Sequence, residues 1–333
     1  MSIGGHKSYG ELFNLVNIFD AWMRFRRGKS RKMKVMEYER HLAENLYDIH
    51  RELTNLTYMH GKYEHFVIRD SKRREIHEAS TRDKLVHQVI YDYLVKIYEP
   101  VFIKDSYSSR VGKGSHKALK TFRYFARLAS IGGGCIYVLK CDIRKYFDNV
   151  DHNILFELIS ERIKDAKTLN VIKEIITSFD AGDIVGRGIP LGNVTSQVFA
   201  NIYLNELDHY VKAILKERFY VRYNDDFVIV DNDRARLEVD LRMIQKFVRD
   251  TLLLDIPANK ASIRKLSWGV DFLGYNILPN CMLLRDKTKV KLYNNLNESN
   301  IESYLGLLKH CDSHNLKQKV MSKLNNYWSM FDD

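Results

Sequence analysis

The stretch Arg222-Tyr223-Asn224-Asp225-Asp226-Phe227-Val228-Ile229-Val230 places two adjacent carboxylates between runs of residues that favour β-strands. With Phe219-Tyr220-Val221 before it, the segment predicts a hairpin that carries Asn224-Asp225-Asp226 at its tip. Two like charges side by side repel, and burial against core strands raises the cost of both. Mg²⁺ would relieve that cost, because this hard ion prefers carboxylate oxygens. The alternative is a solvated Asn-Asp turn, which short hairpins often use.

A second stretch also ends in a carboxylate. Gly132-Gly133-Gly134 leads into the β-rich run 135–142, which finishes at Asp142. An Asp at the end of a buried strand, together with an Asp pair on a hairpin of the same sheet, is what a two-metal nucleotidyl transferase requires. In that chemistry two ions lie roughly 3.5–4 Å apart. One ion activates the attacking 3′ hydroxyl, and the other holds the triphosphate and the leaving pyrophosphate.

The composition is that of an ordinary globular chain with a surplus of basic residues. Its 333 residues, 45% hydrophobic and 29% charged, suffice for two conventional domains or for one palm-centred polymerase hand. The net charge of +11 favours a polyanionic partner and argues against an acidic one. Basic ribosomal or membrane-surface proteins would carry a similar charge.

Cysteine usage and the N-terminus predict the compartment. The four cysteines, Cys135, Cys141, Cys281 and Cys311, form no CxxC pair, so we expect neither a zinc site nor a disulfide framework. Reduced thiols are typical of the cytosol. Without a signal-type h-region or an apolar run long enough to span a bilayer, we expect a cytoplasmic protein with no membrane partner.

The N-terminal third alternates helices with basic segments. Helical spacing of apolar residues predicts helices over 9–23 and about 37–56. The basic run 24–34 between them is either a solvated charged face or a grip for RNA phosphates. Two further strands are expected on either side of the polar turn 70–73. Lys72 and Arg74 of this hairpin are candidates for folding over a triphosphate, and the alternative is that both are exposed turn residues.

Taken together, these segments resemble a reverse transcriptase. The run 140–147, Lys-Cys-Asp-Ile-Arg-Lys-Tyr-Phe, is similar to the family's first catalytic motif, 223–226 to its YxDD box, and 272–275 to its primer grip. The motifs occur in family order from about Leu42 to the tail. The resemblance implies an α+β right-hand polymerase with fingers, a ferredoxin-like palm with an antiparallel sheet, and a short helical thumb. The expected division is an N-terminal helical and basic extension over 1–60, fingers over 61–135, a palm with inserted fingers helices over 136–283, and a thumb over 284–333.

Within that family, residues 188–201 resemble the reverse transcriptases of diversity-generating retroelements. Most relatives carry Gln-Gly where this chain has Leu191-Gly192. Those enzymes copy a template RNA into cDNA with errors at adenines, assisted by a small basic accessory protein. Replacing an amide by Leu191 removes a hydrogen bond near the incoming nucleotide, and with it some discrimination between right and wrong pairs. Asn224 and residues 148–151 depart from that branch, the latter toward group II intron enzymes, and leave a role in antiphage defence open.

The resemblance also implies roles for individual residues. Asp142, Asp225 and Asp226 would hold two Mg²⁺ ions, or Mn²⁺ in their place, with the backbone carbonyl of Ile143 as a further ligand. Lys260 matches the lysine that protonates the leaving pyrophosphate. A general acid of this kind is typically worth about 10²- to 10⁴-fold, and the alternative is a surface lysine.

Phe147, five residues after the first Asp, would be the steric gate. Its ring would clash with a ribonucleotide 2′ hydroxyl and favour DNA synthesis, and the alternative role is core packing. The implied partners are template RNA, the RNA/cDNA duplex and deoxynucleoside triphosphates (dNTPs). A hypothesis of another class is an RNA-binding scaffold with a vestigial site, against which the intact carboxylate trio argues.

Overall fold

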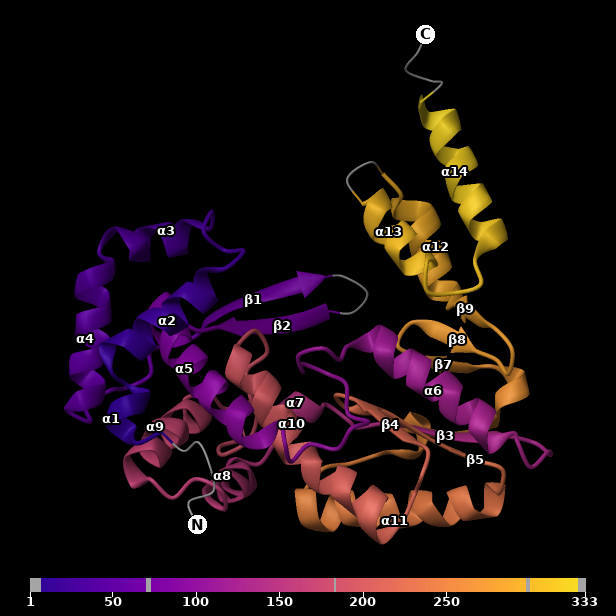
Figure 1. Cartoon of the computed structure of the whole chain (residues 1–333), viewed down its shortest axis with the longest axis horizontal. Coiled ribbons are helices and arrows are strands. Elements are labelled where there is room, and N and C mark those ends of the chain that lie inside the picture. The colour runs from indigo at the N-terminus through magenta and orange to yellow at the C-terminus, as the bar shows by residue number, and fades with distance from the viewer. Residues whose placement is uncertain (1–6, 70–72, 183, 298–299, 329–333) are drawn as a thin grey trace. The chain divides into compact units, whose positions relative to one another are not determined.

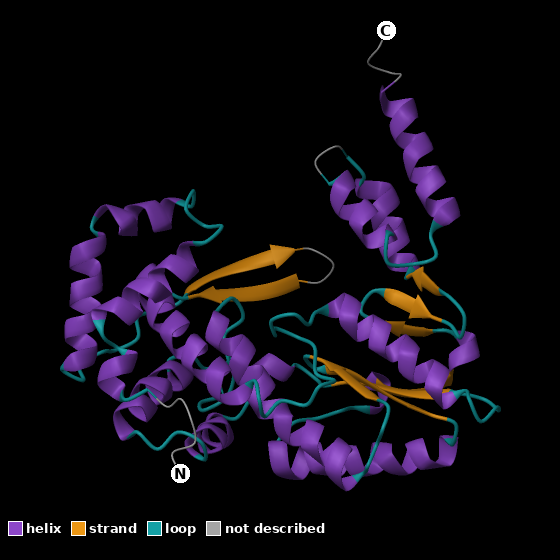
Figure 2. Ribbon diagram, in the orientation of Figure 1, coloured by secondary structure: helices purple, strands orange, loops and turns teal. Residues whose placement is uncertain are grey.

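The computed structural model describes residues 7–69, 73–182, 184–297 and 300–328, which form a mixed α+β protein with antiparallel sheets (Figure 1, Figure 2). The chain divides into two compact units. Unit 1 consists of Met1–Lys104, Ile143–Tyr210 and Ile244–Ile256, and unit 2 of Asp105–Asp142, Val211–Met243 and Pro257–Asp333. In the described part of the chain, no helix combines the length and the apolar character that crossing a bilayer demands.

Unit 2 is built on a four-stranded antiparallel sheet. Its strands are β3 (Tyr137–Asp142), β4 (Tyr220–Tyr223), β5 (Asp226–Asp231) and β6 (Ala261–Lys265), in the spatial order β4-β5-β3-β6. Helices separate β3 from β4 and β5 from β6 along the chain, while β4 and β5 form a hairpin. This is the β-α-β-β-α-β order of a ferredoxin-like unit. The expected ferredoxin-like antiparallel palm is therefore confirmed.

The core of unit 2 joins this sheet to the C-terminal elements. Helix α6 (Ser115–Ala129) lies along the sheet and buries Ala118, Leu119, Phe122 and Ala126, which share one face of the helix (Figure 1). The Phe122 ring packs edge to face on Phe272 at 5.7 Å between centroids. The same core takes in a three-stranded sheet, β7 (Val270–Phe272), β8 (Tyr275–Ile277) and β9 (Met282–Leu284), and three helices, α12 (Asp286–Asn295), α13 (Ile301–Leu308) and α14 (His314–Trp328).

Unit 1 is mainly helical. Helices α2 and α10 pack on α5, and the hairpin of β1 and β2 projects from this helical body in Figure 2. Its elements are α1 (Tyr9–Leu12), α2 (Leu15–Arg26), α3 (Met33–Arg40), α4 (Leu42–Thr54), β1 (Glu64–Arg69), β2 (Arg73–Glu78), α5 (Thr81–Tyr98), α7 (Tyr146–Asn149), α8 (His152–Ser160), α9 (Ala166–Thr177) and α10 (Val194–His209). Helix α11 (Arg234–Leu252) contributes residues to both units.

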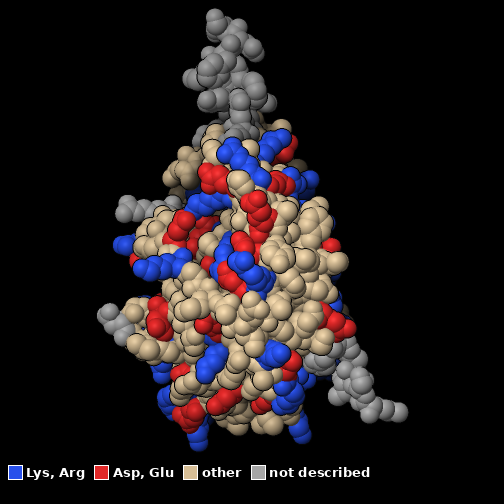
Figure 3. Space-filling model, turned by 90° about the vertical axis from the view of Figure 1, so that its left-hand side faces the viewer, with Lys and Arg blue, Asp and Glu red and all other residues tan. Residues whose placement is uncertain are grey.

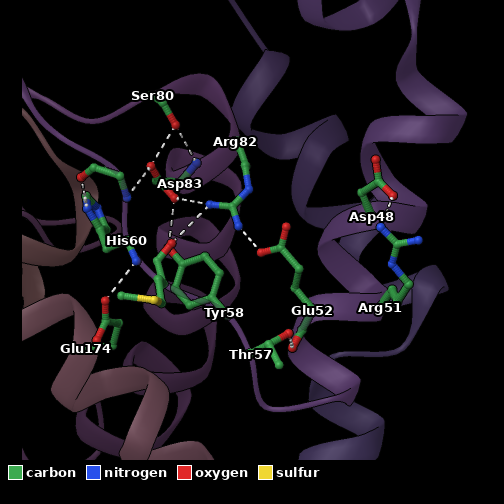
Figure 4. A network of polar contacts seen from close by, with 12 residues as sticks. Asp48, Arg51, Glu52, Thr57, Tyr58, His60, Ser80, Arg82, Asp83 and Glu174 are labelled. Carbon is green, nitrogen blue, oxygen red and sulfur yellow. Dashed lines mark hydrogen bonds and ion pairs between the residues drawn. The ribbon is translucent and has the colours of Figure 1, made fainter.

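A buried carboxylate organises the start of α5. Asp83, fully buried, accepts hydrogen bonds from Tyr58 Oη at 3.0 Å, Ser80 Oγ at 2.7 Å and Arg82 Nη1 at 2.8 Å (Figure 4). Arg82 also pairs with Glu52 on α4. Because a buried charge is costly unless it is paired and hydrogen-bonded, this network holds the N-terminal helices against α5.

Candidate active site

Strand register brings two of the three predicted carboxylates side by side. Asp142, the last residue of β3, is the Cα partner of Asp226, the first residue of β5, in the antiparallel pair. On the other side of β5, Asp226 pairs with Tyr223 of β4. The turn between β4 and β5 contains Asn224, at φ +57°, and Asp225. Asn tolerates this left-handed conformation better than most residues, and the predicted hairpin is confirmed.

Two lysines face these carboxylates. Lys140 lies two residues before Asp142, so both side chains stand on the same face of β3. Its Nζ lies 3.5 Å from Asp226 Oδ2 and donates a hydrogen bond to the carbonyl of Asp271 at 2.7 Å. Lys260, the residue before β6, forms an ion pair with Asp142 Oδ1. Each of the two strand-end carboxylates therefore has a lysine countercharge.

The pKa of Asp226 is strongly perturbed. Burial, the largest cause, together with the charges of Asp142 and Asp225 and against the opposing charge of Lys140, raises the pKa of Asp226 to about 7. Its Oδ1 is buried and has no hydrogen-bond partner among the described residues. A buried carboxylate oxygen without a partner marks a position where the protein itself does not complete the solvation of the charge.

The donor set suits a hard divalent cation. Asp142, Asp225 and Asp226 offer only carboxylate oxygens, which Mg²⁺ and Mn²⁺ prefer, and the Asp226 Oδ1 atom is unsatisfied. In the described part of the chain, no three His, Cys, Asp or Glu side chains converge closely enough to hold one ion. The lysine ion pairs supply the countercharge in this arrangement. The residues present therefore fit a divalent cation in chemistry, and their roles as ligands stay predictions.

A buried arginine supports the hairpin. Arg222 on β4 is fully buried, and its Nη1 donates to the carbonyl of Asn224 at 3.1 Å. The backbone of Arg222 forms two further hydrogen bonds. Its N–H donates to Asp105 O at 3.0 Å, and its carbonyl accepts from Tyr107 N at 2.9 Å. Arg222 therefore fixes the turn from the side chain and from the main chain.

Sequence reasoning assigned no role to Arg222 or Lys140. The available signal was a positive charge inside an otherwise apolar strand, two residues before the turn in one case and two residues before Asp142 in the other.

The candidates for nucleotide binding belong to unit 1, whereas the carboxylates and both lysines belong to unit 2. Arg74 is exposed on β2, and Lys72 lies outside the described residues. Phe147 lies half-buried in α7, with its ring 5.5 Å from that of Tyr146. Ile143 follows Asp142 directly, and its side chain is buried.

The loop before α10 is anchored to β2. The carbonyl of Leu191 accepts a hydrogen bond from His77 N at 3.0 Å. The Asn193 side chain donates to His77 O in the same strand at 2.8 Å and accepts from Ala79 N, directly after the strand, at 3.2 Å. Gly192 has φ +117°, and a Cβ there would lie 2.9 Å from Ile76 Cγ2. Glycine is needed at this position for conformation and for space.

Comparisons with known proteins agree with this geometry. The model of the family "Reverse transcriptase (RNA-dependent DNA polymerase)" matches residues 64–277. The group II intron-encoded protein LtrA of Lactococcus lactis subsp. cremoris is 27% identical over 277 residues, covering 62% of this chain and 44% of LtrA. Protein YkfC of Escherichia coli (strain K12) is 26% identical over 245 residues, covering 63% of this chain and 64% of YkfC. An uncharacterised 91 kDa protein in the cob intron of Schizosaccharomyces pombe is 34% identical over 158 residues, which are 44% of this chain and 18% of that protein.

The fold has a counterpart among solved structures. Telomerase from Candida albicans superposes with a TM-score of 0.53 at 14% identity, covering 72% of this chain and 50% of that one. At that identity the likeness concerns the fold alone, whereas the family match spans both the carboxylate hairpin and the strand of Asp142. The chain therefore belongs to the reverse transcriptase family, the RNA-dependent DNA polymerases.

Proposed function

We propose that this chain is an RNA-directed DNA polymerase that copies a template RNA into cDNA with dNTPs as substrates. The observation that carries the proposal is the cross-strand pairing of Asp142 with Asp226, beside Asp225 and with a buried Asp226 Oδ1 that lacks a partner. Asp142, Asp225 and Asp226 would hold two Mg²⁺ ions, or Mn²⁺, together with the carbonyl of Ile143. When bound, such ions stabilise charge on the attacking and leaving oxygens of the transferred nucleotidyl group.

The protein's own groups would complete the chemistry. Lys260, which pairs with Asp142, would donate a proton to the leaving pyrophosphate, and its neighbouring carboxylate keeps the ammonium in place. Phe147 would exclude the ribonucleotide 2′ hydroxyl, and Lys72 and Arg74 would contact the triphosphate. Within this proposal, fingers, palm and thumb occupy 61–135, 136–283 and 284–333, after an extension over 1–60.

Primer extension tests the proposal. With an RNA template, a DNA primer and Mg²⁺, we expect the wild type to incorporate dNTPs. Asp225→Asn and Asp226→Asn should each lower the rate by at least about 10²-fold, since metal stabilisation of the transition state is worth several kcal/mol. Full extension by a folded Asp226→Asn protein would refute the assignment, and an inactive but RNA-binding wild type would support a vestigial scaffold.

Lys260→Gln separates the general acid from a surface lysine. We expect a loss of about 10²- to 10⁴-fold in incorporation for a general acid. A surface lysine would leave the rate unchanged, so wild-type activity in a folded Lys260→Gln protein would remove Lys260 from the mechanism.

We further propose that the enzyme is error-prone at template adenines and serves a diversity-generating retroelement, with a small basic accessory protein as partner. The proposal rests on Leu191, in the loop that β2 anchors. Misincorporation opposite adenine should fall in Leu191→Gln, because an amide restores a hydrogen bond that discriminates between base pairs. Equal fidelity in both proteins would contradict it.

Two other biological roles use the same chemistry. The similarity to LtrA favours an intron-like role, and the departures at Asn224 and 148–151 keep antiphage defence as an alternative. Two observations distinguish these roles. A template and variable repeat pair with an accessory gene nearby would support diversity generation. Protection of cells against phage that depends on Asp226 would support defence.

A further inference from the structure

On one face of the molecule, the positive charge does not form a continuous surface. On the face shown in Figure 3, the Lys and Arg side chains are interspersed with Asp and Glu among the described atoms. A site for an anion therefore depends on a local surplus of positive charge.

Unit 1 contains such a surplus in a cavity of about 520 Å³, a size within the roughly 300–1,000 Å³ range of small-molecule pockets. Its walls come from the segment 25–35, from residues 78–88 around the start of α5, and from the loop and first turn of α10 at 192–197. The first of these walls precedes the part of the chain that the reverse transcriptase family model matches, residues 64–277. The cavity is thus partly a feature of this chain's own N-terminal segment.

Four lysines and one glutamate line the cavity. Lys84 pairs with Glu78, and Lys34 pairs with Glu64 outside it. Lys29 and Lys32 have no ion pair with a carboxylate in the part of the chain that the structure describes. Within the described residues, these two positive charges therefore have no ion-pair partner.

The half-buried Lys29 faces the most unfavourable surroundings. Its Nζ lies 4.3 Å from the centroid of the Phe25 ring, which orients it. Burial lowers the pKa of Lys29, the ammonium groups of Lys84 and Lys32 lower it further, and Glu78 opposes them. An anion in the cavity would relieve this repulsion.

One wall of the cavity is rigid. Asn193 is buried, and its side-chain amide forms hydrogen bonds with His77 O and Ala79 N. Gly192 packs against Ile76. The side chains of Thr81, Gln88 and Gln197 add hydrogen-bonding groups to the lining. Lysine ammonium groups act as point charges on phosphate, and phosphate contacts carry no base sequence.

We propose that this cavity binds a phosphate group of a nucleotide, with Lys29 and Lys32 as its cationic ligands. The favoured ligand is the phosphate backbone of a single-stranded RNA. Binding of RNA here deepens the proposed function and rests on it. A free mononucleotide carries the same chemistry and is the other source. The two lysines would contact only phosphate, so the site should bind RNA independently of its base sequence.

The test uses the full chain and a fluorescein-labelled 12-nucleotide single-stranded RNA, followed by anisotropy across a salt series without dNTPs. The pocket variant is Lys29→Gln/Lys32→Gln. The matched control is Lys96→Gln/Lys167→Gln, which removes the same charge from two exposed lysines of unit 1 outside the cavity. We expect the pocket variant to bind RNA at least about 10-fold more weakly, with the slope of log affinity against log salt reduced by about 0.7, the contribution of one single-strand phosphate contact. The control should change affinity less than about 2-fold.

A second experiment, thermal unfolding with ATP, tests whether the ligand is a mononucleotide. If ATP is the ligand, it will raise the melting temperature of the wild type and of the control but not of the pocket variant, while RNA affinity stays equal in all three. Lys29→Arg/Lys32→Arg should restore binding in either experiment and shows that charge, rather than folding, is responsible. Equal behaviour of pocket and control variants toward both RNA and ATP would overturn the proposal.

The outcome is separable from that of the polymerase assay. Asp226→Asn should lose primer extension and keep wild-type RNA affinity. If the wild type extends no primer while the pocket variant still loses RNA binding, the proposed polymerase function fails and the phosphate site stands.

Discussion

At the residue scale, the three carboxylates could be predicted because each lies where a β-rich run ends, and strand ends are readable from sequence. Lys140 and Arg222 could not be assigned, because their partners, Asp226 Oδ2 and the Asn224 carbonyl, depend on strand register and turn geometry. Register is set by pairing between segments that are far apart in the chain. The contact of Lys140 with Asp226 and the support of the turn by Arg222 therefore required the structure.

The buried carboxylate of Asp226 should lower the stability of the folded protein. Without divalent ions at pH 8, Asp226→Asn should raise the free energy of unfolding by about 1–3 kcal/mol, because the folded-state pKa of Asp226 near 7 means that ionisation is costly there. Thermal or urea unfolding measures the difference. Asp250→Asn, at an exposed position, should stay within about 0.5 kcal/mol of the wild type.

Added Mg²⁺ should reverse that order. An ion that binds only the folded state stabilises it in proportion to the logarithm of its concentration above Kd. We expect Mg²⁺ to raise the melting temperature of the wild type and to have a much smaller effect on Asp226→Asn. Equal shifts in the two proteins would show that the ion does not bind at this carboxylate.

At the element scale, the strands β3, β4 and β5 agree with the sequence patterns, but two long helices do not. The expected helix over 9–23 is two helices, because the Asn14 side chain accepts the N–H of Asn17 at 2.8 Å and caps a new start. The expected helix over 37–56 likewise consists of α3 and α4, with the break at His41. Apolar periodicity continues across such breaks, so the pattern alone does not locate them.

The histidine pair at α5 predicts acid sensitivity. His87 is buried, with Nδ1 2.6 Å from Thr195 Oγ1 and Nε2 2.9 Å from His60 Nε2. Burial, the largest cause, and the charges of His60 and Lys84 together lower the pKa of His87 to about 3. A base with a depressed folded-state pKa contributes its full stability above its unfolded value of 6.5 and loses it as the pH falls toward 3.

Replacing this histidine should remove the effect. Between pH 6.5 and 4.5 the wild type should lose about 2–3 kcal/mol more than His87→Gln, since one proton is worth about 1.4 kcal/mol per pH unit. Urea unfolding at each pH measures it. His41→Gln, at a surface position, should follow the wild type, and a His87→Gln profile parallel to both would contradict the prediction.

The support that Arg222 gives to the turn between β4 and β5 can also be tested by substitution. Arg222→Lys keeps the charge but should lose the bond to the Asn224 carbonyl, which lowers the free energy of unfolding by about 1–3 kcal/mol. As a positioning residue, it should lower kcat for primer extension and leave the KM for dNTPs nearly unchanged. A large rise in KM at constant kcat would indicate a binding role instead.

At the scale of the whole molecule, composition predicted a basic globular chain, but nothing in it predicted the division into units. The chain alternates between them in six segments, which means five crossings, and α11 contributes to both. Contact patterns of this kind depend on pairings between distant segments, and no change of composition marks them.

These crossings predict cooperative unfolding. We expect Gly192→Ala in unit 1, which is strained at φ +117° and crowded by Ile76, to lower one common unfolding midpoint. The change in fluorescence of buried Trp22 in unit 1 and the far-UV circular dichroism of the whole chain should give the same unfolding midpoint. Gly132→Ala, where a Cβ meets no atom within 4 Å, should leave it unchanged. Separate midpoints for the two probes would show that the units unfold independently.

The position of β6 in the sheet has a consequence during synthesis on the ribosome. β6 covers one edge of β3, yet it begins at Ala261, 119 residues after Asp142 (261 minus 142). At about 5–20 residues per second, the nascent β3 edge would wait roughly 6–24 s for its partner. During that interval an unpaired edge can recruit strands from other chains. Slow translation before residue 261 should therefore favour aggregation, and chaperones that bind nascent chains should raise the yield of folded protein.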